Sequence, residues 1–237
     1  MPEPILVGKR AAAIAAAARV PRGTVLALGT GSTAELSLDA IAKRFPDGGG
    51  LSCVASSGAT EARARALGLP LRPLEEVDGF DLMIDGADEA TIRLELTKGH
   101  GGALLREKLL ARLSREVIIA VDESKMVDRL GARRSIPVEI VPFARPALLR
   151  ALERRGLGPE LRRTPSGAPE LTDNGNELVD LVGAGPIEDP AGLDRELKGW
   201  TGVVETGIFV GIAHRLLLGR PDGSVEELAS PAAPGKP

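Results

Sequence analysis

Hydrophobic and polar positions in the first 128 residues follow two alternating periods. Short apolar runs, typical of buried strands, lead into small polar turns and then into apolar residues at helical spacing. The predicted strands lie in "TVLAL" (24–28), "LSCVA" (51–55), "FDLMI" (80–84) and "EVIIAV" (116–121). Helices are predicted in "TAELSLDAIAKRF" (33–45), "ATEARARALG" (59–68) and "GALLREKLLARLS" (102–114). Strands and helices alternate at short intervals, which predicts an α/β fold with a doubly wound, mostly parallel sheet.

The pattern changes after residue 128. A strand, a helix, two strands joined by a turn, a helix and a strand follow, and this order is typical of a small α+β unit of the split βαβ kind. These elements are "IPVEIVP" (136–142), "RPALLRALERRG" (145–156), "PELRRT" (159–164), "TDNGNELVDLV" (172–182), "PAGLDRELKGW" (190–200) and "GVVETGIFV" (202–210). Their glycine and proline punctuation predicts a separate lobe.

The last part of the chain, "HRLLLGRPDGSVEEL", is predicted to form a hairpin around Pro221 to Gly223 that rejoins the first domain. The final segment, "SPAAPGKP", has the composition of a disordered tail. We therefore predict a catalytic α/β domain made of residues 1–128 and 208–237, and a smaller lobe made of residues 129–207.

The N-terminal segment carries basic residues before an alanine run, a feature shared with signal peptides. The run from Ala11 to Ala18 is only weakly apolar, however, and the segment is better interpreted as an amphipathic helix that ends before Pro21. No uninterrupted apolar stretch approaches the roughly 20 residues that a membrane span needs. We expect no membrane partner.

Composition narrows the function classes. Hydrophobic residues make up 43% of the chain, charged residues 27%, and the net charge is -3, as in an ordinary globular protein. Polyanion binding would need a local basic patch, so we predict no nucleic-acid partner. The single cysteine, Cys53, lies in an apolar run and permits no intramolecular disulfide, which indicates a cytoplasmic protein with a buried thiol.

The segment "LGTGSTAE" places Gly29 and Gly31 between a predicted strand and a helix. A dinucleotide-binding fingerprint would need an acid about 20 residues further on, but the second predicted strand ends in "ASSGAT", with no acid between it and Glu61. Two interpretations remain: the free amides and small hydroxyl residues at the helix N-terminus bind a phosphate, or Ser32 or Thr33 caps the helix. The similar turn "SSGAT" favours phosphate, because two helix N-termini at one sheet edge would face one crevice.

Two acids follow the third predicted strand, where open α/β sheets place their ligands. Asp85 and Asp88 could bind a ligand, or the "DGAD" segment could be a turn whose second acid caps a helix. Lys98 precedes the amide-rich loop "GHGG", and Glu107 lies near the second turn of the next predicted helix. Because helical side chains tilt toward the N-terminus, Glu107 can lean back toward this loop. The alternative is a solvated glutamate that pairs with a nearby Arg or Lys. Lys125, after the fourth strand, adds a positive charge at the same edge.

Other kinds of site find little support. His100 and His214 show no metal-ligand spacing, and the chain has no HxH or CxxC pattern, so no metal site is predicted. No GxSxG elbow is present, and Cys53 has no evident histidine partner, which argues against a hydroxyl or thiol nucleophile.

Taken together, these segments resemble the type A family of ribose-5-phosphate isomerases. The matching segments are "GTGST" (29–33), "DGADE" (85–89), "KGHGGALLREK" (98–108), "DESK" (122–125), "PVEI" (137–140), "TDNGN" (172–176) and "GVVETGIF" (202–209). They occur in family order and span nearly the entire chain. The resemblance implies a sheet domain of the phosphosugar-isomerase and coenzyme-A-transferase type, a ferredoxin-like lobe, a homodimer or homotetramer, and no required cofactor.

The resemblance also implies roles for individual residues. Glu107 is the expected proton acceptor, and Asp85, Asp88 and Lys98 are expected to assist catalysis. The expected substrate-binding residues are Thr30, Gly31, Ser32, Thr33, Asp85, Gly86, Ala87, Asp88, Lys98, Gly99, His100, Gly101 and Lys125. His100 is a departure, since some members have glycine there. Lys9 matches a first-helix lysine and is a weaker phosphate candidate.

The implied reaction interconverts D-ribose 5-phosphate and D-ribulose 5-phosphate in the non-oxidative branch of the pentose phosphate pathway. Glu107 would move a proton between adjacent carbons, and Lys98 with the loop amides would stabilise the enediolate. Two alternatives stay open. A phosphosugar-binding sensor would need no base, and an acyl-CoA-transferase-like enzyme would use a glutamate as a nucleophile on a thioester.

Overall fold

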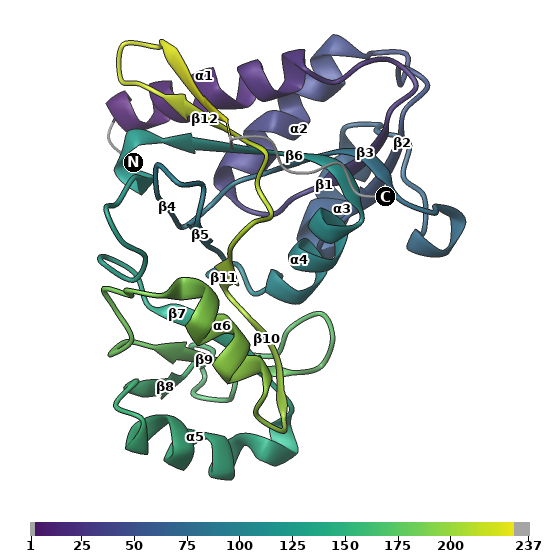
Figure 1. Ribbon diagram of the computed structural model, residues 1–237. Helices are drawn as coiled ribbons and strands as arrows, with labels where there is room; N and C mark the ends of the chain where they lie inside the picture. The colour runs from purple at the N-terminus through teal and green to yellow at the C-terminus, as the bar shows by residue number, and fades with distance from the viewer. Residues whose placement is uncertain (1–2, 230–237) are drawn as a thin grey trace. The chain divides into compact units, whose positions relative to one another are not determined.

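The computed structural model describes residues 3–229, which fold into two compact units (Figure 1). Among the described residues, unit 1 comprises 3–87, 106–126 and 211–229, and unit 2 comprises 88–105 and 127–210. Residues 88–105, which the sequence analysis grouped with the sheet domain, thus cluster with the second unit. The predicted disordered tail, 230–237, lies outside the described residues.

Unit 1 is built on a six-stranded sheet in the order β13-β12-β6-β3-β1-β2. Its strands are β1 (Val25–Leu28), β2 (Ser52–Ala55), β3 (Phe80–Asp85), β6 (Ser114–Asp122), β12 (Arg215–Gly219) and β13 (Val225–Ala229). All neighbouring pairs are parallel except β12 and β13, which form an antiparallel hairpin at the sheet edge. The predicted mostly parallel sheet and the return of the C-terminal hairpin to it are confirmed.

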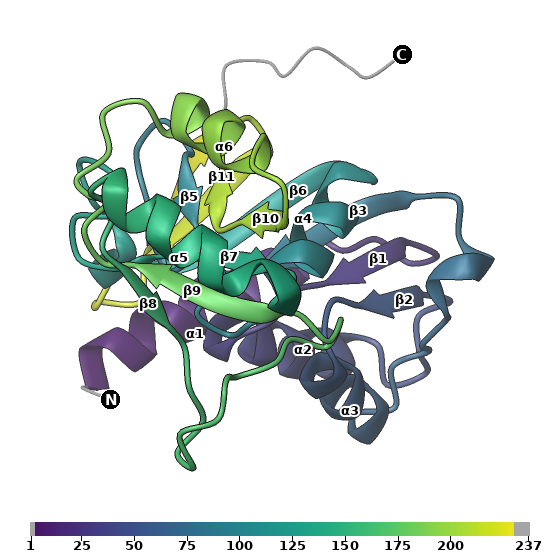
Figure 2. The same ribbon diagram turned by 90° about the horizontal axis from the view of Figure 1, so that it is seen from below.

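The helices of unit 1 cover this sheet. They are α1 (Glu3–Ala18), α2 (Ser32–Arg44), α3 (Gly58–Ala66) and α4 (Leu104–Arg112), with short 3₁₀ turns η1 (Leu74–Glu76) and η2 (Glu123–Lys125). Figures 1 and 2 show α1 and α2 side by side, with α4 on the other face of the sheet. No helix within residues 3–229 is long and apolar enough to cross a membrane.

Small residues let α1 approach the sheet closely. Ala12, Ala13 and Ala16 are fully buried, so the alanine run predicted from the sequence is the packing face of this helix. Gly8 lies so near Gly219 of β12 that a side-chain carbon on either residue would overlap the backbone of the other. This contact fixes the height of α1 along the sheet, and with it the position of the next residue, Lys9.

Unit 2 contains the predicted ferredoxin-like lobe. Its strands β7 (Ile136–Ile140), β8 (Pro159–Leu161), β9 (Glu177–Leu181) and β10 (Val203–Thr206) form an antiparallel sheet in the order β10-β7-β9-β8. Helices α5 (Arg145–Arg154) and α6 (Pro190–Lys198), and the 3₁₀ turn η3 (Pro142–Ala144), complete it (Figure 2). Both helices pack in one apolar cluster with β7 and β9, so they cover the same face. A small sheet, β11-β5-β4, is formed by β4 (Glu89–Ala90), β5 (Leu96–Thr97) and β11 (Ile208–Phe209).

A buried carboxylate organises the turn before β9. Glu139 on β7 has no exposed surface, and its Oε1 accepts hydrogen bonds from Thr172 Oγ1 (2.9 Å), Asn174 Nδ2 (3.0 Å) and Asn176 Nδ2 (2.8 Å). Two of the recognised segments, "PVEI" and "TDNGN", therefore meet in one contact. Because three donors from a single turn converge on one oxygen, we assign these segments a structural role in unit 2.

Replacing Glu139 by leucine should destabilise the protein, because the buried hydroxyl of Thr172 would lose its acceptor, together with the more exposed amides of Asn174 and Asn176. We expect the free energy of unfolding to fall by about 1–3 kcal/mol, the cost of one buried unsatisfied group. Glu160→Leu, on the exposed side of β8, is the control and should change stability by less than about 0.5 kcal/mol. Urea unfolding followed by circular dichroism measures both, and equal losses would contradict this role.

Candidate active site

The candidate residues lie in both units, and each group has its own geometry. Unit 1 holds Lys9, Thr30 to Thr33, Asp85 to Ala87, Glu107 and Lys125, whereas unit 2 holds Asp88 and Lys98 to Gly101. The unit boundary falls inside the "DGAD" segment, between Ala87 and Asp88.

The loop between β1 and α2 presents free backbone donors. Gly31 is the N-cap residue of α2, with φ of 107°, and no side chain caps the helix. The alternative that Ser32 or Thr33 caps α2 is therefore wrong. Uncapped amides and the positive end of the helix dipole are the features that bind phosphate at a helix N-terminus.

The "SSGAT" turn has a different role from the one expected. Ser57 caps α3 by accepting a hydrogen bond from the Thr60 amide, and the hydroxyls of Ser56, Ser57 and Thr60 all lie within 2.8–3.0 Å of Thr30 Oγ1. Thr60 Oγ1 also donates to the carbonyl of Gly29 (3.0 Å). These hydroxyls thus brace the β1–α2 loop.

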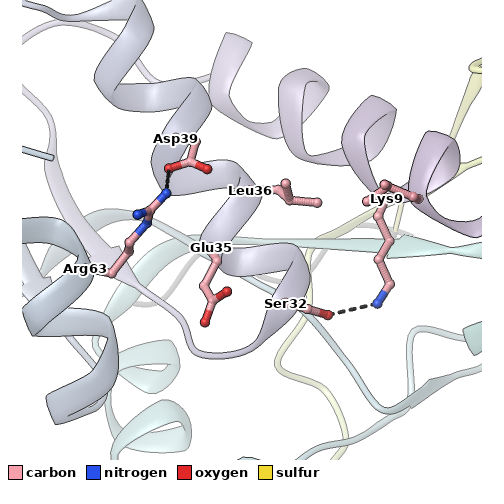
Figure 3. A pocket seen from close by; sticks show the side chains of 7 residues that line it. Lys9, Ser32, Glu35, Leu36, Asp39 and Arg63 are labelled. Carbon is pink, nitrogen blue, oxygen red and sulfur yellow. Dashed lines mark hydrogen bonds and ion pairs between the residues drawn. The ribbon is translucent and has the colours of Figure 1, made fainter. Parts of the chain in front are cut away.

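Lys9 joins the same loop from α1. Its Nζ donates to Ser32 Oγ (2.8 Å), beside a cavity of about 300 Å³ that lies between α1, α2 and Arg63 of α3 (Figure 3). The side chain is only 5% exposed. Burial lowers the pKa of Lys9 below its ordinary 10.5, and Lys125 lowers it further, whereas Asp122 raises it. Lys9 is therefore a more substantial phosphate candidate than its sequence context indicated.

Asp122 is a site residue that the sequence analysis missed. It is 1% exposed at the end of β6 and is the N-cap residue of η2, the turn that carries Lys125, where its Oδ1 accepts hydrogen bonds from the amide and hydroxyl of Ser124. Its negative charge also acts on Lys9. The signal was available, because Asp122 is an acid at the end of a strand in the segment "DESK".

Asp85 ends β3 and is 1% exposed. Its Oδ1 accepts hydrogen bonds from the amides of Gly86 (2.7 Å) and Thr30 (3.2 Å). The carboxylate lies so close to Gly29 that a side chain at that position would overlap it. Asp85 therefore links the ends of two neighbouring strands, and Gly29 is the residue that permits it.

Glu107 lies in the first turn of α4 and is 3% exposed. The sequence analysis placed it near the second turn, because it started the helix too early. The alternative of a solvated helical glutamate is contradicted by this burial. Lys108 beside it is 1% exposed, which the charged segment "LLREKLL" did not predict.

In unit 2, Asp88 contacts the glycine loop. Its amide donates to the carbonyl of Thr97 (2.8 Å), and its Oδ2 accepts a hydrogen bond from the His100 amide (3.1 Å). A strand, β4, follows Asp88, so the interpretation of this acid as a helix cap is wrong. The next acid, Glu89, is 1% exposed and accepts hydrogen bonds from the backbone amides of Gly131, Arg133 and Arg134.

The loop after Lys98 is tightly packed inside unit 2. The Lys98 amide donates to Gly207 O (2.9 Å), and its Nζ lies 5.7 Å from the centre of the Phe209 ring. Gly99 has φ of 107°, and the Gly102 amide donates to its carbonyl (3.0 Å). With the His100 amide bonded to Asp88 and the Gly102 amide bonded to Gly99 O, the amides of Gly99 and Gly101 are the ones suited to a ligand.

The histidines and the cysteine have structural surroundings. His100 Nε2 lies 3.3 Å from Ser135 O, and His214 Nδ1 accepts a hydrogen bond from the Val117 amide (3.1 Å). No cluster of three metal-ligating side chains occurs in residues 3–229. Cys53 is fully buried, and burial raises the pKa of its thiol to about 12, which argues against a thiolate nucleophile.

Known proteins resemble this chain along most of its length. Residues 52–223 match the family described as Ribose 5-phosphate isomerase A (phosphoriboisomerase A). Ribose-5-phosphate isomerase A of Thermomicrobium roseum is 48% identical over 91% of this chain and 91% of its own, and that of Deinococcus radiodurans is 41% identical over 93% and 96%.

Solved structures of ribose-5-phosphate isomerases also resemble this chain along most of its length. A D-ribose-5-phosphate isomerase in complex with phospho-erythronic acid has a TM-score of 0.91 at 32% identity, covering 95% of this chain and 99% of its own. Ribose 5-phosphate isomerase A of Methanocaldococcus jannaschii has a TM-score of 0.87 at 34% identity, covering 93% and 97%.

The close approach of Gly29 to Asp85 can be tested by a double-mutant cycle. Gly29→Ala should lower the free energy of unfolding by about 1–3 kcal/mol, the usual cost of overpacking. In an Asp85→Gly background the same change should cost less than about 1 kcal/mol, because the overlapping carboxylate is gone. Urea unfolding measures all four proteins. Equal costs in the two backgrounds would show that Gly29 is not required by Asp85.

Proposed function

The chain belongs to the ribose 5-phosphate isomerase A family, and from this premise we propose how its own residues carry the reaction. The enzyme interconverts the aldose D-ribose 5-phosphate and the ketose D-ribulose 5-phosphate, a step of the pentose phosphate pathway. A proton leaves C2 of the open-chain aldose and returns at C1, while a hydroxyl proton moves between the two oxygens. The intermediate is an enediol or enediolate.

Glu107 is the base in this proposal. The observation that carries the assignment is its burial: a glutamate in a segment as charged as "LLREKLL" is 3% exposed in the first turn of α4. Charged side chains are almost never fully buried unless they are paired, so this burial sets Glu107 apart from a solvated glutamate on a helix surface. One carboxylate can remove the proton from C2 and deliver it to C1, and such acid-base catalysis contributes about 10²–10⁴-fold.

Lys98 and the amides of Gly99 and Gly101 supply positive charge for the enediolate oxygen. Preorganised donors of this kind cost no reorganisation during the reaction. Asp85 accepts hydrogen bonds from the amides of Gly86 and Thr30, and Asp88 accepts one from the amide of His100, so each carboxylate is held in a fixed orientation. We assign them the hydroxyl protons of the sugar and assistance to ring opening, without dividing these tasks between them.

The phosphate group is held in unit 1. The uncapped N-terminus of α2, with Ser32 and Thr33, supplies amides and hydroxyls, and Lys9 and Lys125 supply charge. Charge-assisted hydrogen bonds are about twice as strong as neutral ones, so these groups provide most of the binding energy. Phospho-erythronic acid, which binds a structural relative, offers the same phosphate with a carboxylate in place of the reacting carbons.

The cellular setting and the assembly are part of the same proposal. A cytoplasmic enzyme agrees with the single buried thiol, Cys53. A homodimer or homotetramer is expected from the family resemblance. A phosphosugar sensor and a coenzyme-A-transferase-like enzyme are not favoured, because the relatives that match along the whole chain are isomerases.

Turnover of ribose 5-phosphate, measured as ribulose 5-phosphate with EDTA present, tests the assignment. We expect turnover of the phosphorylated sugar, and ribose itself should be a poor substrate. Comparable turnover of ribose and ribose 5-phosphate would contradict the proposal that the phosphate group holds the substrate. Binding of ribose 5-phosphate without turnover would indicate a sensor.

Replacing Glu107 by glutamine should lower kcat by at least about 10²-fold, because the amide keeps the shape of the side chain but cannot accept the proton. Inhibition by phospho-erythronic acid and the thermal midpoint should stay near those of the wild type. Glu61→Gln is the matched control, since Glu61 also lies in the first turn of a helix but is exposed. Nearly full activity of the Glu107 variant would return the role of base to Asp85 or Asp88.

The lowered pKa of Lys9 predicts an alkaline limit to substrate binding. Lys9 is charged at pH values below its pKa, which is itself lower than 10.5. We therefore expect kcat/KM to fall as the pH rises through the pKa of Lys9. Lys9→Arg stays protonated at every accessible pH and should move the fall to higher pH. Lys43→Arg, in the last turn of α2, is the control. An alkaline limb that is the same in all three proteins would exclude Lys9 as its source.

A further inference from the structure

Arg162 contacts the glycine loop from the ferredoxin-like lobe. It follows β8, and its guanidinium grips Asp180 of β9 with two hydrogen bonds, from Nε to Oδ2 (2.8 Å) and from Nη2 to Oδ1 (2.7 Å). The two side chains are 13% and 17% exposed. A bidentate pair of this kind fixes the plane of the guanidinium as well as its position.

The remaining nitrogen of Arg162 binds the loop itself. Nη1 donates to the carbonyl of Gly99 (3.1 Å) and to that of His100 (3.2 Å). Two successive peptide groups of the loop are therefore held by one atom, whose place is set by the strand pair β8–β9.

The contact of Arg162 with the loop carbonyls also sets the direction of the loop amides, because both groups belong to the same planar peptides. In a planar trans peptide the C=O and the N–H of the next residue point in opposite directions. Fixing the carbonyls of Gly99 and His100 toward Arg162 thus directs the amides of His100 and Gly101 away from it. The His100 amide meets Asp88 Oδ2, which shows that the amide side of the loop is the side that carries a candidate substrate-binding acid.

The loop needs such an external tether. Gly99, Gly101 and Gly102 have no side chains to restrict them, and Gly99 and Gly102 adopt positive φ angles of 107° and 77°. Glycine loses more conformational freedom on folding than any other residue. Without a contact that holds its carbonyl groups, the loop would adopt many backbone conformations, and its amides would point in many directions.

We propose that Arg162 is a positioning residue for the isomerase reaction: it orients the Gly99–His100 and His100–Gly101 peptides so that their amides face Asp88 and the substrate. This role rests on the proposed function. The hydrogen bonds of Arg162 go to Asp180, Gly99 and His100, so its loss should affect the chemical step more than the binding of phosphate.

The chain offers a matched pair of variants. Arg162→Met removes all the contacts, whereas Arg162→Lys keeps the charge but cannot form the fork with Asp180. Arg163→Met is the control, because Arg163 is the adjacent, exposed arginine, and it donates to the carbonyl of Gly167 only. Asp180→Asn keeps the size of its side chain and replaces Arg162→Met if that variant fails to fold.

We expect Arg162→Met to lower kcat for ribose 5-phosphate by about 10- to 100-fold, as loop misplacement of about 1 Å can cost 10²-fold. KM and the inhibition constant of inorganic phosphate should change by less than about threefold, given that the phosphate groups are untouched. Arg162→Lys should be intermediate, and Arg163→Met should equal the wild type. Hydrogen exchange of the peptide covering residues 98–103 should be faster in both Arg162 variants.

Two results would overturn this role. One is a folded Arg162→Met, or Asp180→Asn, protein with kcat within about twofold of the wild type. The other is unchanged hydrogen exchange in the loop, since that readout does not depend on activity. If the wild type itself does not turn over ribose 5-phosphate, the proposed function fails, and loop exchange still decides whether Arg162 holds the loop.

Discussion

Parallel pairing of β1, β3 and β6 is the constraint on which the site residues of unit 1 depend. Leu28 pairs with Ile84, so β1 and β3 end at nearly the same level of the sheet, whereas β6 continues past Ile119, the partner of Asp85, as far as Asp122. Strand pairing alone therefore brings residues that are distant in sequence close together. The Asp85 carboxylate then adds a direct link, since it bonds the amide of Thr30 in the loop that follows the neighbouring strand. The sheet thus brings the strand ends together, and the carboxylate of Asp85 fixes the level of the β1–α2 loop.

The two glycine loops share a physical problem and solve it in the same way. Glycine lets a backbone approach a ligand closely, but it also leaves the backbone amides free to turn. In unit 1 the Gly29 carbonyl is held by Thr60 and the Thr30 amide by Asp85. In unit 2 the corresponding tethers are Arg162 on the carbonyls and Asp88 on an amide. Side chains from other elements thus hold each loop in place, whereas the glycines of the loop itself let a ligand approach the backbone closely.

What the sequence could predict was local or periodic. Apolar runs and helical spacing gave the strands, the helices and the order of elements, and the rule that ligands lie beyond strand ends marked Asp85 and Lys125. Contacts between side chains far apart in sequence left no such trace. Nothing near Lys9 indicates that it will be buried against Ser32, and nothing near Arg162 indicates Gly99. The hydroxyls of "SSGAT" could equally have faced a ligand. Their inward bonding to Thr30 follows from the packing of α3, which periodicity does not encode.

The contact between Gly8 and Gly219 has a consequence for the order in which the protein matures during synthesis. The helix that carries Lys9, α1, is made before β1, β2, β3 and β6, whereas the strand against which it packs, β12, is made after all of them. Contacts of such long sequence separation form late, because a large loop must be closed before they stabilise anything. A nascent chain can therefore pair β1, β2, β3 and β6 while Lys9 is still unplaced. The strand that sets the height of α1 on the sheet is made long after α1 itself, so the position of Lys9 is fixed only once β12 has been made.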